Sequence, residues 1–213
     1  MPSGNSRTKL FNQRKAVWST KETKNQLALY KRILFSYHKY DSKEIFIMKK
    51  LVVYFSRTGE NSVNGAIEVI EKGYTEIIAE KIAKETGAAL WKLEPEEPYP
   101  FNYQECVKRA NSEGWVKYIN KLENLDGYDV IFLGFPNWYR TYPRIIATFI
   151  RDHNFFGKVV IPFCTNEEGA MGFAESELKS AAKGAIIKTG FACRGYEAEK
   201  CDKELKEWLE KVL

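Results

Sequence analysis

The sequence predicts an α/β fold in which a doubly wound, five-stranded parallel sheet carries helices on both faces. From Met48 onward, apolar runs alternate with helical patterns, and right-handed crossovers turn such alternation into a parallel sheet. The first run, residues 51–55 (LVVYF), is continuously apolar, as expected of a strand covered on both faces. With 44% hydrophobic and 29% charged residues among 213, the composition excludes a disordered chain, a collagen and a coiled-coil rod.

The strands and helices are predicted to alternate along the domain. Short apolar runs predict strands at 51–55, 88–93, 129–134, 158–164 and 185–193, the last being the least regular. Apolar residues at helical spacing predict helices at 75–84, 104–122, 145–151, 175–183 and 197–212.

Local residues support several of these boundaries. Thr75 is expected to cap the first helix, Glu76 to favour its positive end and Gly87 to end it. Gly114 is a weak point in the second helix. The proline-rich loop 95–101 before that helix interrupts regular structure.

Residues 1–47 are predicted to be a basic, loosely ordered extension, and residues 48–213 the folded domain. The extension holds 10 Lys and Arg against 3 Asp and Glu, a charge of +7, whereas the domain holds 23 against 25, a charge of −2. The basic character therefore belongs to the extension, which carries no known nucleic-acid motif. A basic arm for a membrane surface or a partner is the alternative interpretation of this segment.

Composition also argues against several kinds of site. The four cysteines, Cys106, Cys164, Cys193 and Cys201, form no CxxC pair, and only two histidines are present, so no zinc spacing exists. Such cysteine usage favours a reducing cytoplasm over a secreted disulfide framework. No apolar run is long enough to span a membrane. We therefore expect a cytoplasmic protein with no metal site, no membrane span and no nucleic-acid partner.

The loop after the first strand suits a phosphate group. Hydroxyls and backbone N–H groups that follow a strand and lie near a helix N-terminus favour anions, because that helix end carries partial positive charge. The loop supplies two pieces separated by an insertion, Ser56-Arg57-Thr58-Gly59 and Gly73-Tyr74-Thr75. Since both pieces flank the helix start, we expect them to meet at the phosphate.

Two further loops at the same edge of the sheet suit a flat, polar ring. After the third strand comes Pro136-Asn137-Trp138-Tyr139, whose aromatic rings can stack on a planar ligand. Trp138 is expected to stack on or flank that ring, and Tyr139 is the alternative candidate for the same face. After the fourth strand, residues 165–169 offer polar groups for hydrogen bonds to the edge of the ring, with candidates Thr165, Asn166, Glu167 and Gly169.

Two other functions of this architecture are excluded by the first loop. A response-regulator receiver needs a pair of acidic residues after the first strand, and a low-molecular-weight tyrosine phosphatase needs Cys-x5-Arg there. Here Phe55 is followed by Ser56 and Arg57.

Together and in this order, the three loops resemble those of the flavodoxin family. The resemblance extends from about Met48 to Leu213 and is most specific to bacterial flavodoxin-like proteins with S-R-x-G-E-N, P-N-W-aromatic and C-T-x-E-G loops. It implies strand order 2-1-3-4-5 and FMN bound by the residues of the three loops named above. Relatives often have glycine in place of Arg140, so this chain's turn is expected to change conformation less easily.

The resemblance implies electron transfer or flavin-dependent oxidoreduction, in which the flavin carries the redox step and no side chain is catalytic. The redox partner is a protein or a small-molecule acceptor, with NAD(P)H as a candidate donor. Two alternatives stay open: an NAD(P)H-dependent quinone or FMN reductase, and a regulatory FMN-binding protein without turnover.

Overall fold

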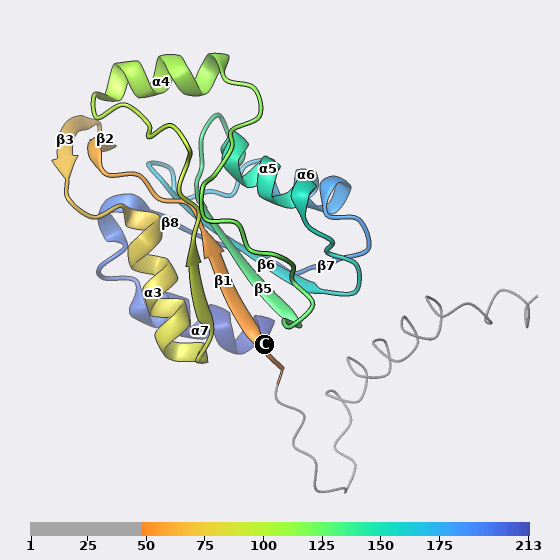
Figure 1. Ribbon diagram of the computed structural model, residues 1–213. Helices are drawn as coiled ribbons and strands as arrows, with labels where there is room; N and C mark the ends of the chain where they lie inside the picture. The colour runs from red at the N-terminus through yellow and green to blue at the C-terminus, as the bar shows by residue number, and fades with distance from the viewer. Residues whose placement is uncertain (1–47) are drawn as a thin grey trace, which may run out of the picture. The chain divides into compact units, whose positions relative to one another are not determined.

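A computed structural model describes residues 48–213, so the predicted extension lies outside the described residues. The parallel sheet contains β1 (Lys50–Tyr54), β4 (Ala89–Lys92), β5 (Val130–Pro136) and β6 (Val159–Asn166) in the order β4-β1-β5-β6 (Figure 1). Two short strands, β7 (Ile186–Ile187) and β8 (Phe191–Arg194), share the fifth position beside β6. The predicted fold class and strand order 2-1-3-4-5 are confirmed.

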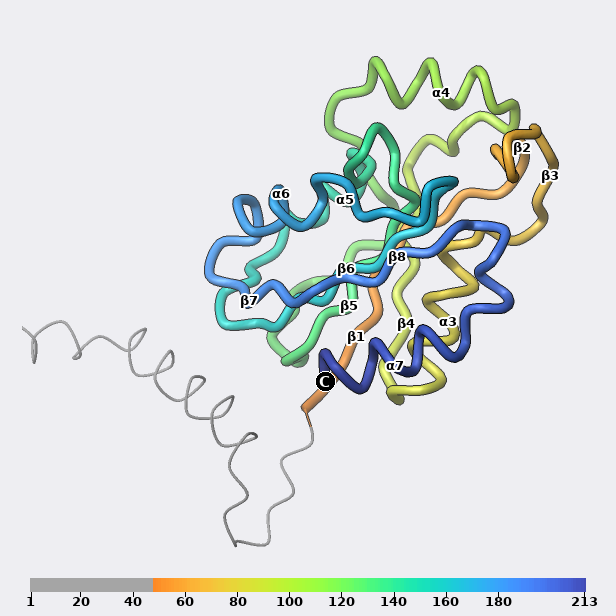
Figure 2. Tube along the Cα trace, turned by 180° about the vertical axis from the view of Figure 1, so that it is seen from behind, coloured from red at the N-terminus to blue at the C-terminus, as the bar shows by residue number. Residues whose placement is uncertain are grey.

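Helices cover both faces of the sheet because side chains of each strand alternate between two cores. One face packs against α3 (Tyr74–Thr86) and α7 (Asp202–Val212), the other against α5 (Arg144–Asp152) and α6 (Ala174–Ala181) (Figures 1 and 2). In β1, for example, Val53 belongs to the core under α5 and Val52 to the core under α3. The continuous apolar runs of the sequence are therefore explained by burial on both sides.

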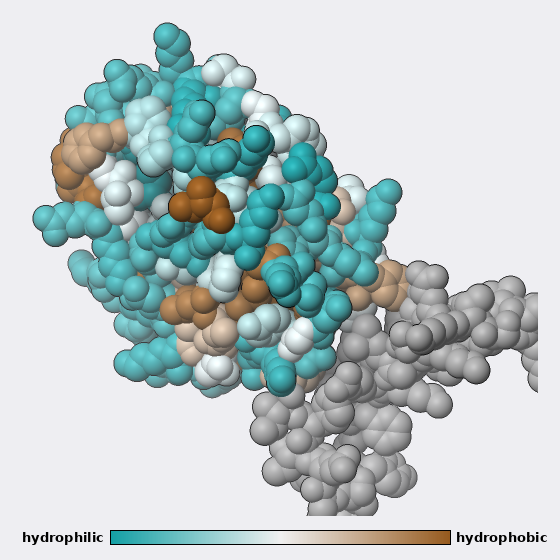
Figure 3. Space-filling model, viewed as in Figure 1, coloured by the Kyte–Doolittle hydropathy of each residue, from teal (hydrophilic) through white to brown (hydrophobic). Residues whose placement is uncertain are grey.

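An antiparallel hairpin fills the insertion in the first loop. Strands β2 (Gly59–Val63) and β3 (Ala66–Ile70) are joined at Asn64 and Gly65, which both have positive φ, 51° and 84°. Asn-Gly between two strands is a strong hairpin signal that the element predictions above missed. Figure 3 shows hydrophobic surface at this end of the molecule, where Ile67 and Val69 are 49% and 60% exposed.

The predicted helix at 104–122 is too long, because the structure ends it early. Helix α4 (Tyr103–Ser112) is capped by Asn102, whose side chain accepts a hydrogen bond from the backbone N–H of Glu105 at 3.1 Å. It stops just before Gly114, the predicted weak point. The residues that follow are irregular, with an isolated bridge between Pro95 and Tyr118, and Tyr118 is buried in the core.

The last strand and the last helix also differ from the prediction. Pro162 of β6 has no N–H to donate, so the neighbouring strand breaks into β7, paired with residues 159–160, and β8, paired with residues 163–166. The closing helix was expected from residue 197, but a 3₁₀ turn, η1 (Gly195–Glu197), comes first and α7 begins at Asp202.

Candidate functional site

The three predicted loops meet at the carboxyl edge of the sheet, where they enclose a cavity of about 140 Å³. We call it the loop cavity. It lies beside the hairpin, which Figures 1 and 2 both place beyond this edge of the sheet. Ten of the fifteen predicted site residues line it: Ser56, Arg57, Tyr74, Thr75, Pro136, Asn137, Trp138, Thr165, Asn166 and Glu167.

The two pieces of the first loop come together at the start of α3. The backbone N–H of Glu76 donates to Ser56 Oγ at 3.1 Å, so a serine from β1's loop caps a helix twenty residues later. Gly73 permits this approach, because a Cβ at Gly73 would lie 2.1 Å from Ser56 Oγ and 2.6 Å from the Arg57 carbonyl oxygen. The first N–H groups of a helix lack partners within it, and Tyr74 and Thr75 of this turn line the loop cavity. The arrangement favours an anion.

The expectation that Thr75 caps this helix is wrong. Gly73 occupies the N-cap position, and Thr75 lies inside the first turn, where it is buried. Its hydroxyl instead shares a 2.8 Å hydrogen bond with the hydroxyl of Thr165 from the third loop. The bond joins the first loop to the third across the floor of the cavity.

Arg57 ties the first loop to the proline-rich loop. Its guanidinium donates to the carbonyl oxygens of Glu60, Pro100 (2.6 Å) and Phe101 (2.8 Å), and the residue is 9% exposed. No other basic residue lines the loop cavity among those that the structure describes. An anion in the cavity would therefore be held mainly by hydroxyl and N–H groups, with the Arg57 charge turned toward carbonyls.

The third loop is organised by Asn166. Its Oδ1 accepts from the backbone N–H groups of Gly169 (2.5 Å) and Ala170 (3.2 Å), which closes the loop on itself. Burial raises the pKa of the neighbouring Cys164 thiol to about 12, so the thiol stays protonated and contacts the Ala170 carbonyl oxygen at 3.6 Å. The Cys164 side chain is therefore a core thiol rather than a nucleophile.

The hairpin contacts this third loop across the loop cavity. The backbone N–H of Gly65, at the hairpin tip, donates to Glu167 Oε2 at 2.9 Å. Burial, followed by the nearby charges of Glu68 and Glu167, raises the pKa of Tyr74, which keeps its phenol neutral. Glu167 thus holds the hairpin tip through a hydrogen bond and also lines the loop cavity.

The second loop makes a tight turn that places its two aromatic residues differently. The backbones of Trp138 and Thr141 exchange hydrogen bonds of 2.9 and 3.0 Å, while Tyr139 and Arg140 have φ of 52° and 67°. Trp138 packs edge-on against Phe55 (ring centroids 5.7 Å apart) and Tyr99 (5.0 Å) and lines the loop cavity. Tyr139 is 58% exposed and lies outside this cavity.

A second hollow continues the site along the second and third loops. It measures about 290 Å³ and shares Asn137, Asn166 and Glu167 with the loop cavity. We call it the rim hollow; Tyr139 and Arg140 line it. An elongated ligand with an anionic end at α3 could therefore extend a planar group over these two loops.

Four predicted site residues lie outside both hollows, and the prediction missed five residues that line the loop cavity. Thr58 is exposed, Gly59 opens β2, Gly73 caps α3 and Gly169 closes the third loop. The missed residues come from the hairpin, the start of α4 and the turn after β8: Asn61, Ser62, Ile70, Tyr103 and Gly195. Recognising the Asn-Gly turn would have indicated the hairpin residues, whereas Tyr103 and Gly195 carry no local signal.

The turn at Gly172 provides a test of how tightly these loops pack. Gly172 has φ of 62°, and a Cβ there would lie 2.2 Å from the Arg140 carbonyl oxygen. We expect Gly172→Ala to lower the free energy of unfolding by about 2–5 kcal/mol, from left-handed strain of about 1–2 kcal/mol plus overpacking of about 1–3 kcal/mol. Urea denaturation measures it. Gly87→Ala is the matched control: it has φ of 68° and open space, so only the strain should remain. Equal losses in the two variants would contradict the close packing.

Within residues 48–213, no helix is long and apolar enough to cross a membrane. In the same part of the chain, no three His, Cys, Asp or Glu side chains gather closely enough to hold a metal ion.

Comparison with solved structures identifies similar folds. Two proteins assigned as flavoproteins, from Bacteroides eggerthii and Bacteroides uniformis, are each 29% identical, with TM-scores of 0.62 and 0.57. The alignments cover 78% and 76% of this chain and 98% of each of those chains. A flavoprotein of Lactobacillus acidophilus, solved in complex with FMN, is 18% identical with a TM-score of 0.52, covering 76% of this chain and 99% of its own. The comparison with curated proteins found no match.

The comparison with protein families covers nearly the whole described part of the chain. The flavodoxin model matches residues 49–212, from the start of β1 to the end of α7. That span includes all three loops of the site and the hairpin between them. The chain therefore belongs to the flavodoxin family.

Proposed function

We propose that this chain binds FMN and carries out electron transfer or flavin-dependent oxidoreduction. The observation that carries the proposal is the junction of Ser56 with the start of α3, beside Trp138 at the carboxyl edge of the sheet. Ligands of doubly wound sheets bind at this edge, where the strand order reverses. Membership of the flavodoxin family supports it, as does the similar fold of the Lactobacillus acidophilus flavoprotein, which was solved with FMN.

The residues present fit this cofactor. Ser56, Tyr74 and Thr75 surround a helix N-terminus, which suits a single phosphate. Trp138 and the polar groups of Asn137 and Asn166 lie farther along the second and third loops, where a ring system would rest. Cofactor pockets generally measure about 300–1,000 Å³, and the loop cavity and the rim hollow reach this range only when one ligand occupies both.

When bound, FMN would supply one-electron and two-electron redox chemistry. The chain's own residues would bind and orient it: Ser56 and the start of α3 at the phosphate, and Trp138 at the ring. The hairpin, held by Glu167, would cover the ligand and exclude water. No side chain is assigned as acid, base or nucleophile.

We propose a redox partner, either a protein or a small-molecule acceptor, with NAD(P)H as a candidate donor. Residues 48–213 carry a net charge of only −2, which gives little support to a strongly acidic face for docking a protein partner. This small charge favours a small-molecule acceptor. We also propose a cytoplasmic location, supported by the four cysteines, all buried free thiols.

Removing the Ser56 hydroxyl tests the phosphate site. Ser56→Ala should weaken FMN binding about 10–100-fold, because a hydrogen bond to a charged group contributes about 1.5–3 kcal/mol. Riboflavin, which lacks the phosphate, should bind within about twofold of the wild type. Quenching of flavin fluorescence measures both affinities.

Thr58→Ala is the matched control, because Thr58 is an exposed hydroxyl of the same loop that does not line the loop cavity. It should leave both affinities unchanged. Equal weakening of FMN and riboflavin by Ser56→Ala would mean that Ser56 acts only as a structural cap of α3.

A further inference from the structure

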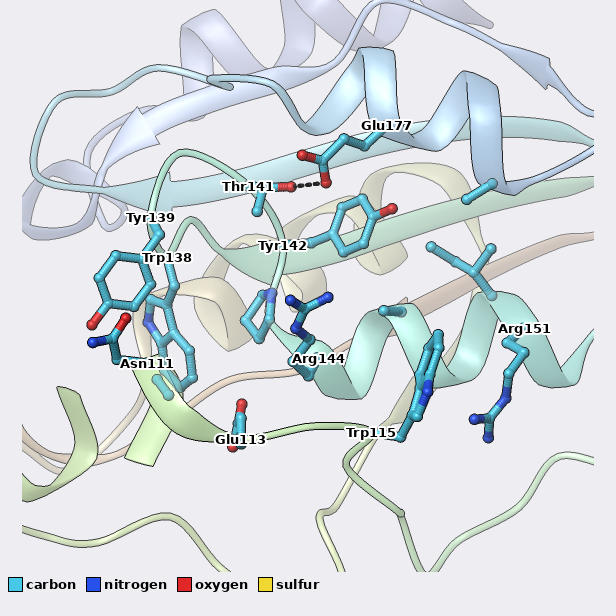
Figure 4. A pocket seen from close by; sticks show the side chains of 15 residues that line it. Asn111, Glu113, Trp115, Trp138, Tyr139, Thr141, Tyr142, Arg144, Arg151 and Glu177 are labelled. Carbon is cyan, nitrogen blue, oxygen red and sulfur yellow. Dashed lines mark hydrogen bonds between the residues drawn. The ribbon is translucent and has the colours of Figure 1, made fainter. Parts of the chain in front are cut away.

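A larger pocket lies on the other side of Trp138 and is used by nothing described so far. It measures about 570 Å³ and lies between the end of α4 with its following loop and the helices α5 and α6 (Figure 4). We call it the aromatic pocket. Trp138 lines both this pocket and the loop cavity, and Tyr139 lines both this pocket and the rim hollow.

Aromatic rings and small side chains form most of its wall. Trp115, Trp138, Tyr139 and Tyr142 come from two separate loops; in Figure 4, Trp138 and Tyr139 lie at one end, Trp115 lies toward the other and Tyr142 lies between them. Trp115 is 61% exposed, although a large apolar ring is usually buried. Alanines of α4, α5 and α6 leave room between the rings. Such a space accepts a planar ligand that stacks on or lies between aromatic side chains.

One exposed guanidinium of this pocket, that of Arg144, forms no ion pair within residues 48–213. Arg144 begins α5, whose first turn carries no acidic side chain. Arg151 of the same helix pairs with Asp152 at 2.8 Å, and its guanidinium lies 4.5 Å from the centroid of the Trp115 ring. Among residues 48–213, by contrast, no carboxylate pairs with Arg144. A free guanidinium at a helix N-terminus attracts an acidic group.

Two acidic side chains also line the pocket, and each accepts a hydrogen bond from a hydroxyl group. Glu177 accepts a 2.5 Å hydrogen bond from the Thr141 hydroxyl, drawn in Figure 4. Glu113, whose side chain is 8% exposed, accepts from the Tyr99 hydroxyl at 2.7 Å through Oε1. Its Oε2 lies 3.5 Å from Arg109 Nε, close enough for charge attraction, but accepts no hydrogen bond. Oε2 has almost no surface open to solvent, so a ligand hydroxyl reaches it only if the Glu113 side chain turns toward the pocket. Because a buried acceptor without a donor is costly, that contact would be stabilising.

We infer that the aromatic pocket binds a planar aromatic acid that carries a hydroxyl group. The acidic group binds Arg144, the ring packs among Trp115, Trp138 and Tyr142, and the hydroxyl donates to Glu113. This site is separate from the proposed FMN site, with the Trp138 side chain between them. The inference does not depend on the FMN proposal, and it provides a place for a small-molecule partner one side chain away from that cofactor.

Calorimetric titration of the full-length protein with 6-hydroxy-2-naphthoate tests this inference. The affinity for 6-hydroxy-2-naphthoate should be at least tenfold higher than that for 2-naphthol, which lacks the acid. It should be at least about threefold higher than that for 2-naphthoate, which lacks the hydroxyl. Arg144→Gln should abolish the preference for the acid, whereas Arg140→Gln, which removes a guanidinium four residues earlier that does not line the pocket, should preserve it. Saturating FMN should leave the affinity for 6-hydroxy-2-naphthoate unchanged.

The possible results distinguish this site from the proposed cofactor site. Equal binding of the acid and 2-naphthol, no binding of either, or an unaltered preference in Arg144→Gln would overturn the inference. Displacement of 6-hydroxy-2-naphthoate by FMN would also overturn it, because the pocket would then belong to the flavin. A protein that binds 6-hydroxy-2-naphthoate as expected but does not bind FMN would refute only the cofactor proposal.

Discussion

Trp138→Ala should weaken FMN binding by one to three orders of magnitude. Aromatic stacking contributes about 0.5–1.5 kcal/mol, and lost burial of a large side chain adds about 1.5–3 kcal/mol, at about 1.4 kcal/mol per tenfold change. Riboflavin should be weakened to the same degree, because the contact concerns the ring rather than the phosphate. Titration of flavin fluorescence with both ligands measures the two losses.

Trp115→Ala is the matched control for this variant. Trp115 lines the aromatic pocket, which Trp138 also lines, but neither the loop cavity nor the rim hollow, so its loss should leave both flavin affinities unchanged. Because Trp138 also packs against Phe55 and Tyr99, unfolding of the ligand-free variant must be measured alongside binding. If Trp138→Ala is folded and binds both ligands like the wild type, Trp138 serves only the core or the aromatic pocket.

Gly73→Ala should have the largest effect at the phosphate end. Its Cβ would overlap Ser56 Oγ and the Arg57 carbonyl oxygen, so the first loop must move away from α3. We expect FMN affinity to fall about 100-fold or more, since two hydrogen bonds to the phosphate at about 1.5 kcal/mol each would be lost. Overpacking should also lower the free energy of unfolding by about 1–3 kcal/mol.

Gly127→Ala provides the comparison, because a Cβ at Gly127 meets nothing within 4 Å. This variant should keep the wild-type affinity for FMN and nearly the wild-type stability. Wild-type FMN binding by Gly73→Ala would show that the contact between the first loop and α3 does not hold the phosphate.

The fold could be predicted from the sequence because its main signals are local and repeated. Each central strand is an apolar run, and burial on both faces of the sheet, as for Val52 and Val53, is what makes that run continuous. Two of the errors occur where a distant residue decides the local structure, whereas the hairpin was missed although its Asn-Gly turn is a local signal. Pro162 of β6 splits the strand that lies beside β6, and the burial of Tyr118 keeps the expected helical segment after residue 112 out of a helix.

The part of the candidate site that could be predicted consists of residues at the carboxyl ends of strands, because parallel strands bring these ends to one edge of the sheet. Ser56 and Asn137 each follow a central strand and Thr165 lies near the end of another, so knowledge of the strand order suffices to place them side by side. The roles of Arg57 and Thr75 could not be predicted, since the carbonyls around Arg57 and the hydroxyl beside Thr75 belong to segments far along the chain. The aromatic pocket was missed for the same reason, because Trp115 reaches it from an irregular loop.

The most direct test of the central claim is a titration of the purified wild-type protein with FMN and with riboflavin, followed by flavin fluorescence. FMN binding at the junction of Ser56 and α3 predicts quenching by a stoichiometric amount of protein, with FMN bound at least tenfold more tightly than riboflavin. Unchanged FMN fluorescence, or equal affinity for the two flavins, would contradict the account.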